Sequence, residues 1–240
     1  MSTIVAIGGG EIADAETEAI DEAILAATGA DDPTVLFVPT ASGDAEEYCE
    51  TFADYYGEQL GAAVETLRLV TGSQSAETVE AKIANADAVY VGGGDTGFML
   101  DTWRTRGVVE LLRRAWRDDT VLAGLSAGAL CWASGGLSDA VALEDVTYGP
   151  VTGTGFLDGI HLTVHAGPER RAAFADYLVE RGVPGVALED EAALEVTDGE
   201  WRLRTSSPNA FAYLLSPTKD TYEVEPLPDD GSYRPLDTLR

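Results

Sequence analysis

One serine in this chain lies in the sequence setting of a covalent nucleophile. The pentapeptide Gly124-Leu125-Ser126-Ala127-Gly128 follows a short apolar run, 121–123, and precedes small residues that suit the start of a helix. This G-x-S-x-G pattern is typical of a nucleophile elbow, a sharp strand-to-helix turn that presents the serine hydroxyl at the edge of a sheet. Glycines on both sides remove the Cβ atoms that would clash in so tight a turn. The sequence therefore predicts acyl chemistry at Ser126.

A serine nucleophile needs a general base, and the chain contains only two histidines. His161 falls inside an expected strand, 160–164, whereas His165 falls at the C-terminal end of that strand. Catalytic groups of α/β proteins gather at this edge of the sheet. We therefore expect His165 to be the base and His161 to have a structural role.

The base in turn needs a carboxylate to orient it, and two positions suit that role. Asp190 follows an apolar strand, 185–188, and so lies at a C-terminal strand edge. Asp139 lies thirteen residues after Ser126, in the expected loop beyond the elbow helix. Position favours Asp190, and Asp139 is the competing acid.

Two glycine clusters resemble nucleotide-binding turns. The first spans 8–10, and the second, Gly92-Gly93-Gly94-Asp95-Thr96-Gly97, is a literal G-x-G-x-x-G after an expected strand. A dinucleotide-binding fold would have an acidic residue at the end of the following strand, but here that strand ends in Ser126. We therefore predict no cofactor and interpret the first cluster as a tight turn. In the second, the N–H group of Gly93 or Gly94 is expected to join that of Ala127 in binding an oxyanion.

The composition restricts the partners of the chain. Its 240 residues include 42 acidic and 15 basic side chains, which gives a net charge of −27. Such a surface does not neutralise phosphates, so we expect neither nucleic acid nor an anionic membrane as a partner. Only two residues are lysines, while 45% of the chain is hydrophobic. An acidic, lysine-poor surface over an ordinary core suggests a protein adapted to concentrated salt.

Cysteine usage and the termini indicate a cytoplasmic protein. Cys49 and Cys131 lie far apart and match no metal or redox spacing, so both are interpreted as reduced core thiols, and no metal site is predicted. The N-terminus lacks the basic and apolar regions of an export signal, and no later stretch has the length of a membrane span.

Short β-branched runs alternate with segments of helical period, which predicts a single doubly wound α/β domain with a mostly parallel sheet flanked by helices. We assign this domain to residues 1–225 and a C-terminal surface arm to 226–240, which is rich in Pro, Asp and Gly. An irregular segment is expected after Gly135-Gly136, to about 159. The expected strands are 3–7, 34–38, 64–70, 88–91, 120–124, 160–164, 185–188, 192–196 and 201–204, and the expected helices are 13–28, 45–60, 76–84, 97–117 and 169–181.

The order nucleophile, histidine, acid differs from the serine, acid, histidine order of the α/β-hydrolases. Four motifs run along most of the chain: Phe37-Val38-Pro39-Thr40-Ala41-Ser42-Gly43-Asp44, Val91-Gly92-Gly93-Gly94-Asp95-Thr96, Gly124-Leu125-Ser126-Ala127-Gly128-Ala129 and Ala187-Leu188-Glu189-Asp190. With these motifs and this order of residues, the chain resembles the serine peptidase family of peptidase E (aspartyl dipeptidase) and cyanophycinase. The fold of that family is similar to the class I glutamine amidotransferase domain, with serine in place of cysteine.

The resemblance implies Ser126 as nucleophile, His165 as base and Asp190 as the acid, with Asp139 near an aspartate also implicated in activity. It also reveals a departure, because the family's Gly-Gly-Gly-Asn-Thr becomes Gly-Gly-Gly-Asp-Thr here. A carboxylate at Asp95 would oppose negative charge at the oxyanion site, unless it caps the following helix.

A second departure concerns the substrate. Aspartyl dipeptidases hold an acidic side chain with an arginine in a long loop after the histidine, whereas only four residues separate His165 from Arg170 and Arg171. Either arginine is able to bind a carboxylate or to pair with one of the many surface acids. We expect a small peptide substrate, with a silent binding protein or a small-molecule esterase or amidase as alternatives. A homodimer is left open.

Overall fold

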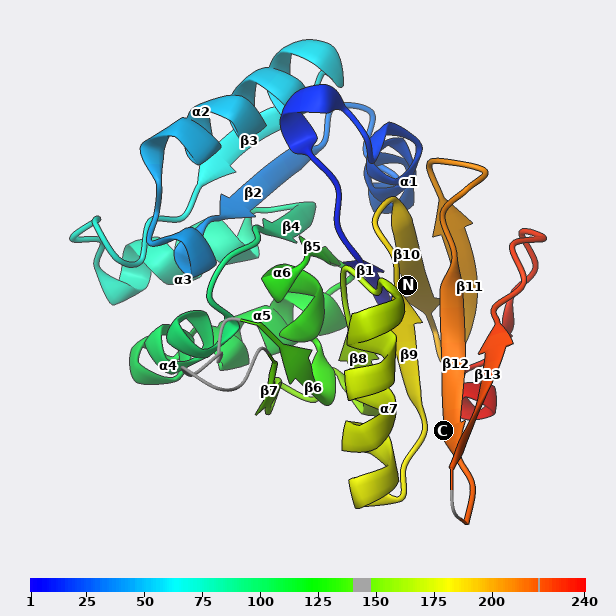
Figure 1. The fold of residues 1–240 in the computed structure, drawn as a ribbon. Coiled ribbons are helices and arrows are strands. Elements are labelled where there is room, and N and C mark those ends of the chain that lie inside the picture. The colour runs from blue at the N-terminus through cyan, green and yellow to red at the C-terminus, as the bar shows by residue number, and fades with distance from the viewer. Residues whose placement is uncertain (140–147, 220) are drawn as a thin grey trace.

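The computed structural model describes residues 1–139, 148–219 and 221–240, which form two sheets flanked by helices (Figure 1). In the larger sheet, a parallel core is extended on one side by antiparallel strands. The parallel strands are β1 (Thr3–Ile7), β5 (Val121–Leu125), β4 (Ala88–Val91), β2 (Thr34–Val38) and β3 (Ala63–Thr66), in that order across the sheet. Beyond β1 lie β10 (Ala192–Thr197), β11 (Glu200–Thr205) and β14 (Arg234–Pro235).

The smaller sheet combines parallel and antiparallel pairs. Its central strands, β6, β8 and β9, are parallel to one another, and the strands outside them are antiparallel. Across the sheet the order is β13 (Tyr222–Pro226), β12 (Ala212–Pro217), β9 (Gly185–Leu188), β8 (Leu157–Thr163), β6 (Ala133–Ser138) and β7 (Gly149–Val151). In Figure 1, α7 (Pro168–Arg181) lies across the front of β8 and β9.

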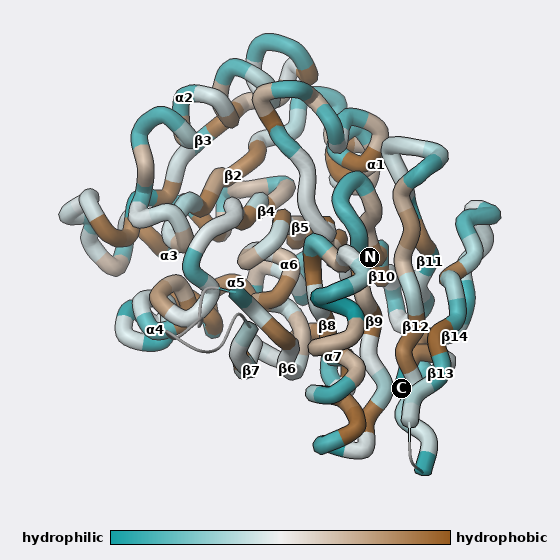
Figure 2. Tube along the Cα trace, viewed as in Figure 1, coloured by the Kyte–Doolittle hydropathy of each residue, from teal (hydrophilic) through white to brown (hydrophobic). Residues whose placement is uncertain are grey.

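Successive side chains of each strand point to opposite faces of the larger sheet, and a layer of helices packs against each face. In β1, Val5 and Ile7 face the layer of α1 (Glu18–Thr28) and α2 (Glu46–Ala53), whereas Ile4 and Ala6 face the opposite layer. That opposite layer contains α3 (Ala76–Ala84), α4 (Thr96–Arg106), α5 (Val108–Arg117) and the short α6 (Ala127–Leu130). Figure 2 shows the resulting pattern, with brown central strands and helices in which teal alternates with white and brown. The expected α/β domain, doubly wound and flanked by helices, is therefore confirmed.

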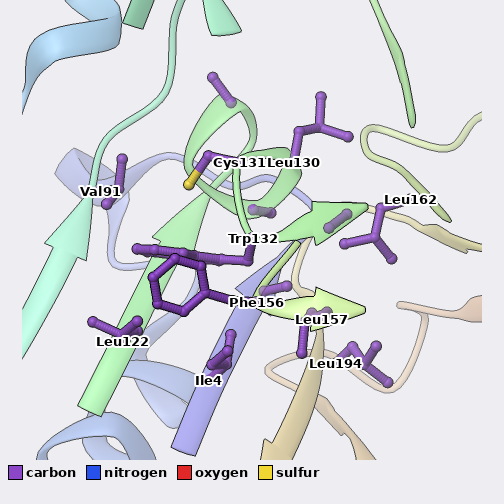
Figure 3. Close-up of a cluster of buried hydrophobic side chains, with 14 of the residues drawn as sticks. Ile4, Val91, Leu122, Leu130, Cys131, Trp132, Phe156, Leu157, Leu162 and Leu194 are labelled. Atoms are coloured by element: carbon purple, nitrogen blue, oxygen red, sulfur yellow. The ribbon is translucent and has the colours of Figure 1, made fainter. Parts of the chain in front are cut away.

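A core cluster holds α6 against the sheet. Beneath it, the rings of Trp132 and Phe156 meet edge to face, with their centroids 5.4 Å apart (Figure 3). They belong to the same buried cluster as Ile4 and Leu122 from two adjacent strands. Because the elbow serine immediately precedes α6, this packing fixes its position relative to the strand ends.

Two regions differ from the expected elements. The helix expected at 97–117 is divided into α4 and α5 by Gly107, which takes a left-handed φ of 69°. Gly135-Gly136 and the two residues after them lie in β6, and 149–151 form β7, whereas 152–156 are irregular as expected and 140–147 lie outside the described residues. A Cβ on Gly136 would lie 2.1 Å from the Leu162 carbonyl oxygen, so close strand pairing requires glycine there.

The C-terminal residues run along the surface and are anchored to the larger sheet. β14 pairs with β11, and Trp201 donates its indole N–H to the Thr238 hydroxyl at 2.9 Å. Leu236 and Leu239, in a short 3₁₀ turn, are buried. Across the described residues, no helix combines the length and apolar character that crossing a bilayer requires.

Candidate active site

The peptide backbone is sharply bent at the serine. Ser126 follows β5 and precedes α6 with φ 57° and ψ −111°, a conformation that costs about 1–3 kcal/mol in a non-glycine residue. The bend depends on glycine on either side: a Cβ on Gly124 would lie 2.3 Å from the Gly128 carbonyl oxygen. A Cβ on Gly128 would lie 2.1 Å from the carbonyl oxygen of Val91. Residues 124–128 therefore form the sharp turn that the sequence predicts.

The end of β1 joins the three segments that carry Ser126, His165 and Asp190. The consecutive carbonyl groups of residues 7–9 accept the N–H groups of Ser126, His165 and Glu191 at 3.0, 3.1 and 2.9 Å. His165 and Glu191 both have positive φ values, 47° and 60°. One strand end thus sets the relative positions of segments that are far apart in the sequence.

The three side chains form a continuous hydrogen-bonded chain. His165 Nε2 lies 2.8 Å from Ser126 Oγ, and His165 Nδ1 lies 2.6 Å from Asp190 Oδ1. The hydrogen bond from His165 lowers the pKa of Asp190 and outweighs the effect of its partial burial. An ionised Asp190 keeps the proton on Nδ1, which leaves Nε2 to accept the serine proton.

Gly9 is a site residue that the sequence analysis missed. A Cβ at this position would lie 1.9 Å from Asp190 Oδ1 and 2.4 Å from His165 Nδ1. The glycine cluster at 8–10 was interpreted as a tight turn only. The sequence signal for Gly9 is its position just after the strand that pairs with β5, because adjacent parallel strands end at the same edge of the sheet.

The second glycine cluster lies beside the serine. A Cβ on Gly93 would be 3.5 Å from the Cβ of Ser126, and Gly94 takes a φ of 136°. The Gly93 N–H donates to the Tyr48 hydroxyl oxygen at 3.3 Å. Among the hydrogen bonds of the described residues, none uses the Ala127 N–H at the start of α6. This donor is available to an incoming carbonyl oxygen.

Asp95 acts as the N-cap of α4. Its carboxylate accepts the Phe98 N–H at 2.9 Å, and its φ and ψ of −81° and 106° are those of an N-cap residue. The charge of Asp95 is thus engaged by the helix N-terminus.

The two arginines after His165 are held by groups within the protein. Arg170, which is only 4% exposed, pairs with Asp139 at 2.5 Å and donates to the Val164 carbonyl. Asp139 therefore contacts this arginine and not His165. Arg171 pairs with Glu189 at 2.6 Å.

His161 lies away from the other site residues. Its Nδ1 is 2.9 Å from the Tyr177 hydroxyl, and burial, more than the nearby Arg181 charge, lowers its pKa. The structure thus places the two histidines in different surroundings.

A hollow of about 450 Å³ opens beside Ser126. Its lining includes Glu11, Glu16 and Tyr48 in addition to Gly93 and the serine. The site is open to solvent, since the His165 and Asp190 side chains are 39% and 55% exposed. In the part of the chain that is described, no group of three or more His, Cys, Asp or Glu side chains is arranged to hold a metal ion.

The fold, together with an elbow serine that is hydrogen-bonded to a histidine, is characteristic of α/β serine hydrolases. The chain matches the model of peptidase family S51 over residues 4–204. It is also 32% identical over 235 residues to the uncharacterized peptidase YgaJ of Bacillus subtilis (strain 168), covering 95% of this chain and 98% of the relative. The chain therefore belongs to peptidase family S51 and is a serine peptidase.

Two solved structures are similar in fold. A peptidase from an acI-B1 Actinobacterium aligns with a TM-score of 0.73 and 18% identity, covering 98% of this chain and 97% of the other. A putative peptidase E protein from Listeria monocytogenes EGD-e aligns with a TM-score of 0.61 and 19% identity, covering 86% of this chain and all of the other. The expected resemblance to the peptidase E family is confirmed.

Proposed function

We propose that this serine peptidase hydrolyses small peptides, as a dipeptidase, through an acyl-enzyme at Ser126. Ser126 Oγ attacks the scissile carbonyl while His165 Nε2 takes its proton. His165 then returns the proton to the leaving amine as the C–N bond breaks. Water, deprotonated by the same imidazole, hydrolyses the ester and restores the serine.

The observation that carries this proposal is the hydrogen-bonded chain from Asp190 through His165 to Ser126, at 2.6 and 2.8 Å. These distances are within the reach that proton transfer requires. Because Asp139 is paired with Arg170, Asp190 is the acid in the proposed mechanism.

The surroundings of the serine favour a small substrate without an acidic side chain. The hollow of about 450 Å³ has the size of a small-molecule pocket. Glu11 and Glu16 lie in its wall, while Arg170 and Arg171 are engaged by protein acids. We therefore propose that neutral or basic N-terminal residues are preferred over aspartate.

The alternative of a silent binding protein was suggested by Asp95 and by the short loop after His165. The capping contact of Asp95 removes the first of these grounds. An esterase or amidase acting on a small molecule would use the same three side chains, so substrate screening has to distinguish it from a dipeptidase.

A dipeptide panel tests the proposal. Wild type and Ser126→Ala are compared on Asp-X, Leu-X and Lys-X dipeptides and on p-nitrophenyl esters, with release of free amino acid or nitrophenol as the readout. Loss of the nucleophile should lower kcat by about 10⁶. Turnover of esters but of none of the dipeptides would support the esterase, and unchanged turnover by Ser126→Ala would exclude Ser126 as the nucleophile.

A further inference from the structure

The ring of Tyr48 is held in one orientation in the wall of the hollow beside Ser126. Tyr48 lies in the first turn of α2, and its side chain lines the hollow together with Gly93 and the serine. The rings of Phe37 and Tyr48 meet edge to face, with their centroids 5.0 Å apart. A Cβ on Gly92 would lie 2.8 Å from Tyr48 Cε1, so the ring is confined from that direction too.

The hydroxyl group of Tyr48 has a hydrogen to donate. In its 3.3 Å contact with Gly93, the backbone N–H supplies the hydrogen and the phenol oxygen accepts it. Among the hydrogen bonds of the described residues, none takes the phenolic hydrogen itself. Gly93 borders the nucleophile, because a Cβ there would contact the Ser126 Cβ at 3.5 Å. The phenol and the serine thus line the same hollow, on either side of Gly93, and the phenolic donor is unused.

We propose that the Tyr48 hydroxyl donates a hydrogen bond to the substrate carbonyl oxygen as that oxygen becomes negative, with the Ala127 N–H as the second donor. This inference rests on the proposed function of Ser126. It changes the role of Gly93 from a direct oxyanion donor to a support that orients the phenol. No bond to hydrogen is broken, because the phenol keeps its proton while the hydrogen bond strengthens in the tetrahedral intermediate.

The protonation state of Tyr48 agrees with this role. Burial raises the pKa of Tyr48 to about 12. The phenol therefore stays protonated at neutral pH. An ionised phenol in the same place would repel the oxyanion.

Tyr48→Phe tests the proposal, with Tyr90→Phe as the matched control. The hydroxyl of Tyr90 is buried and has no hydrogen-bond partner among the described residues, and its ring belongs to the same aromatic cluster. Tyr48→Phe should lower kcat on the preferred dipeptide by about 10²–10³ with little change in KM, because an oxyanion donor acts in the transition state. Tyr90→Phe should retain wild-type turnover.

A second readout separates an oxyanion donor from a structural role. A boronic acid analogue of the substrate forms a tetrahedral adduct with Ser126, and its affinity for Tyr48→Phe should fall by the same factor as kcat, while product binding is unchanged. If Tyr48→Phe turns over as fast as wild type or faster, the proposal is wrong, because the released Gly93 N–H is then the donor. If wild type shows no turnover that is lost in Ser126→Ala, the proposed function is wrong instead, and this inference fails with it.

Discussion

Gly9→Ala should disable the peptidase while leaving its fold intact. The new Cβ would lie 1.9 Å from Asp190 Oδ1 and 2.4 Å from His165 Nδ1, so the carboxylate has to move by more than 1 Å. That movement breaks the 2.6 Å hydrogen bond that orients the imidazole. The backbone itself accepts alanine, because the φ of Gly9 is not among the positive values.

The expected losses follow from these contacts. A displacement of about 1 Å in a catalytic group costs about 10² in rate, and complete loss of the orienting acid costs about 10⁴. We therefore expect kcat to fall by about 10²–10⁴. The displaced side chains are 39% and 55% exposed and are able to turn into solvent, so the free energy of unfolding should change by no more than about 1 kcal/mol.

The assay compares Gly9→Ala with Gly167→Ala, in which the new Cβ meets no atom within 4 Å. Dipeptide turnover and urea unfolding are measured for both, and the control should match wild type. Adding Gly9→Ala to Asp190→Ala should cost less activity than Gly9→Ala costs in the wild type, because the hydrogen bond to Asp190 is already absent and only the contact with His165 remains. Wild-type turnover by Gly9→Ala, or full additivity with Asp190→Ala, would refute the reasoning.

Three further predictions concern stability and charge. Asp21 is buried and hydrogen-bonded to Tyr56, and burial raises its pKa from 3.8 to about 6. Because the folded state binds this proton more tightly, the free energy of unfolding should fall by up to about 3 kcal/mol as the pH rises from 4 to 6. Above pH 6 the free energy of unfolding should level off. Urea unfolding of Asp21→Asn over the same pH range should not show this fall. Asp95→Ala should lose about 1 kcal/mol of stability, because the N-cap of α4 is removed. Asp95→Asn should retain the cap and change kcat little. A large gain in kcat for Asp95→Asn would place the carboxylate at the oxyanion. With a net charge of −27, the midpoint of thermal unfolding should rise steeply with KCl, and full stability in dilute buffer would contradict adaptation to salt.

The strand ends explain why much of this site was predictable from the sequence. Apolar runs before Ser126, His165 and Asp190 indicate strands whose C-terminal ends meet at one edge, and the structure brings these three side chains together there. The G-x-S-x-G spacing is predictable for a steric reason, because the sharp turn leaves no room for a Cβ at Gly124 or Gly128. The peptidase E-like family was predicted from motifs along most of the chain, and that assignment is confirmed.

The features that the sequence did not reveal depend on contacts between distant segments. Gly9 matters because of Asp190, which lies 181 residues further along the chain. β6 contains Gly135-Gly136, which locally favours irregular structure, and only close pairing with β8 makes those glycines part of a strand. The partners of Arg170 and Arg171 are likewise set by tertiary packing, since many acids compete for them in so acidic a chain.

Labelling with a fluorophosphonate tests the central claim most directly, because only an activated serine reacts with such a probe. Intact-protein mass spectrometry and peptide mapping are applied to wild type, Ser126→Ala and, as a matched control, Ser207→Ala. We predict one adduct on Ser126 in wild type and in the control, and no adduct in Ser126→Ala. An unlabelled wild type, or equal labelling of Ser126→Ala, would contradict the assignment of Ser126 as the nucleophile.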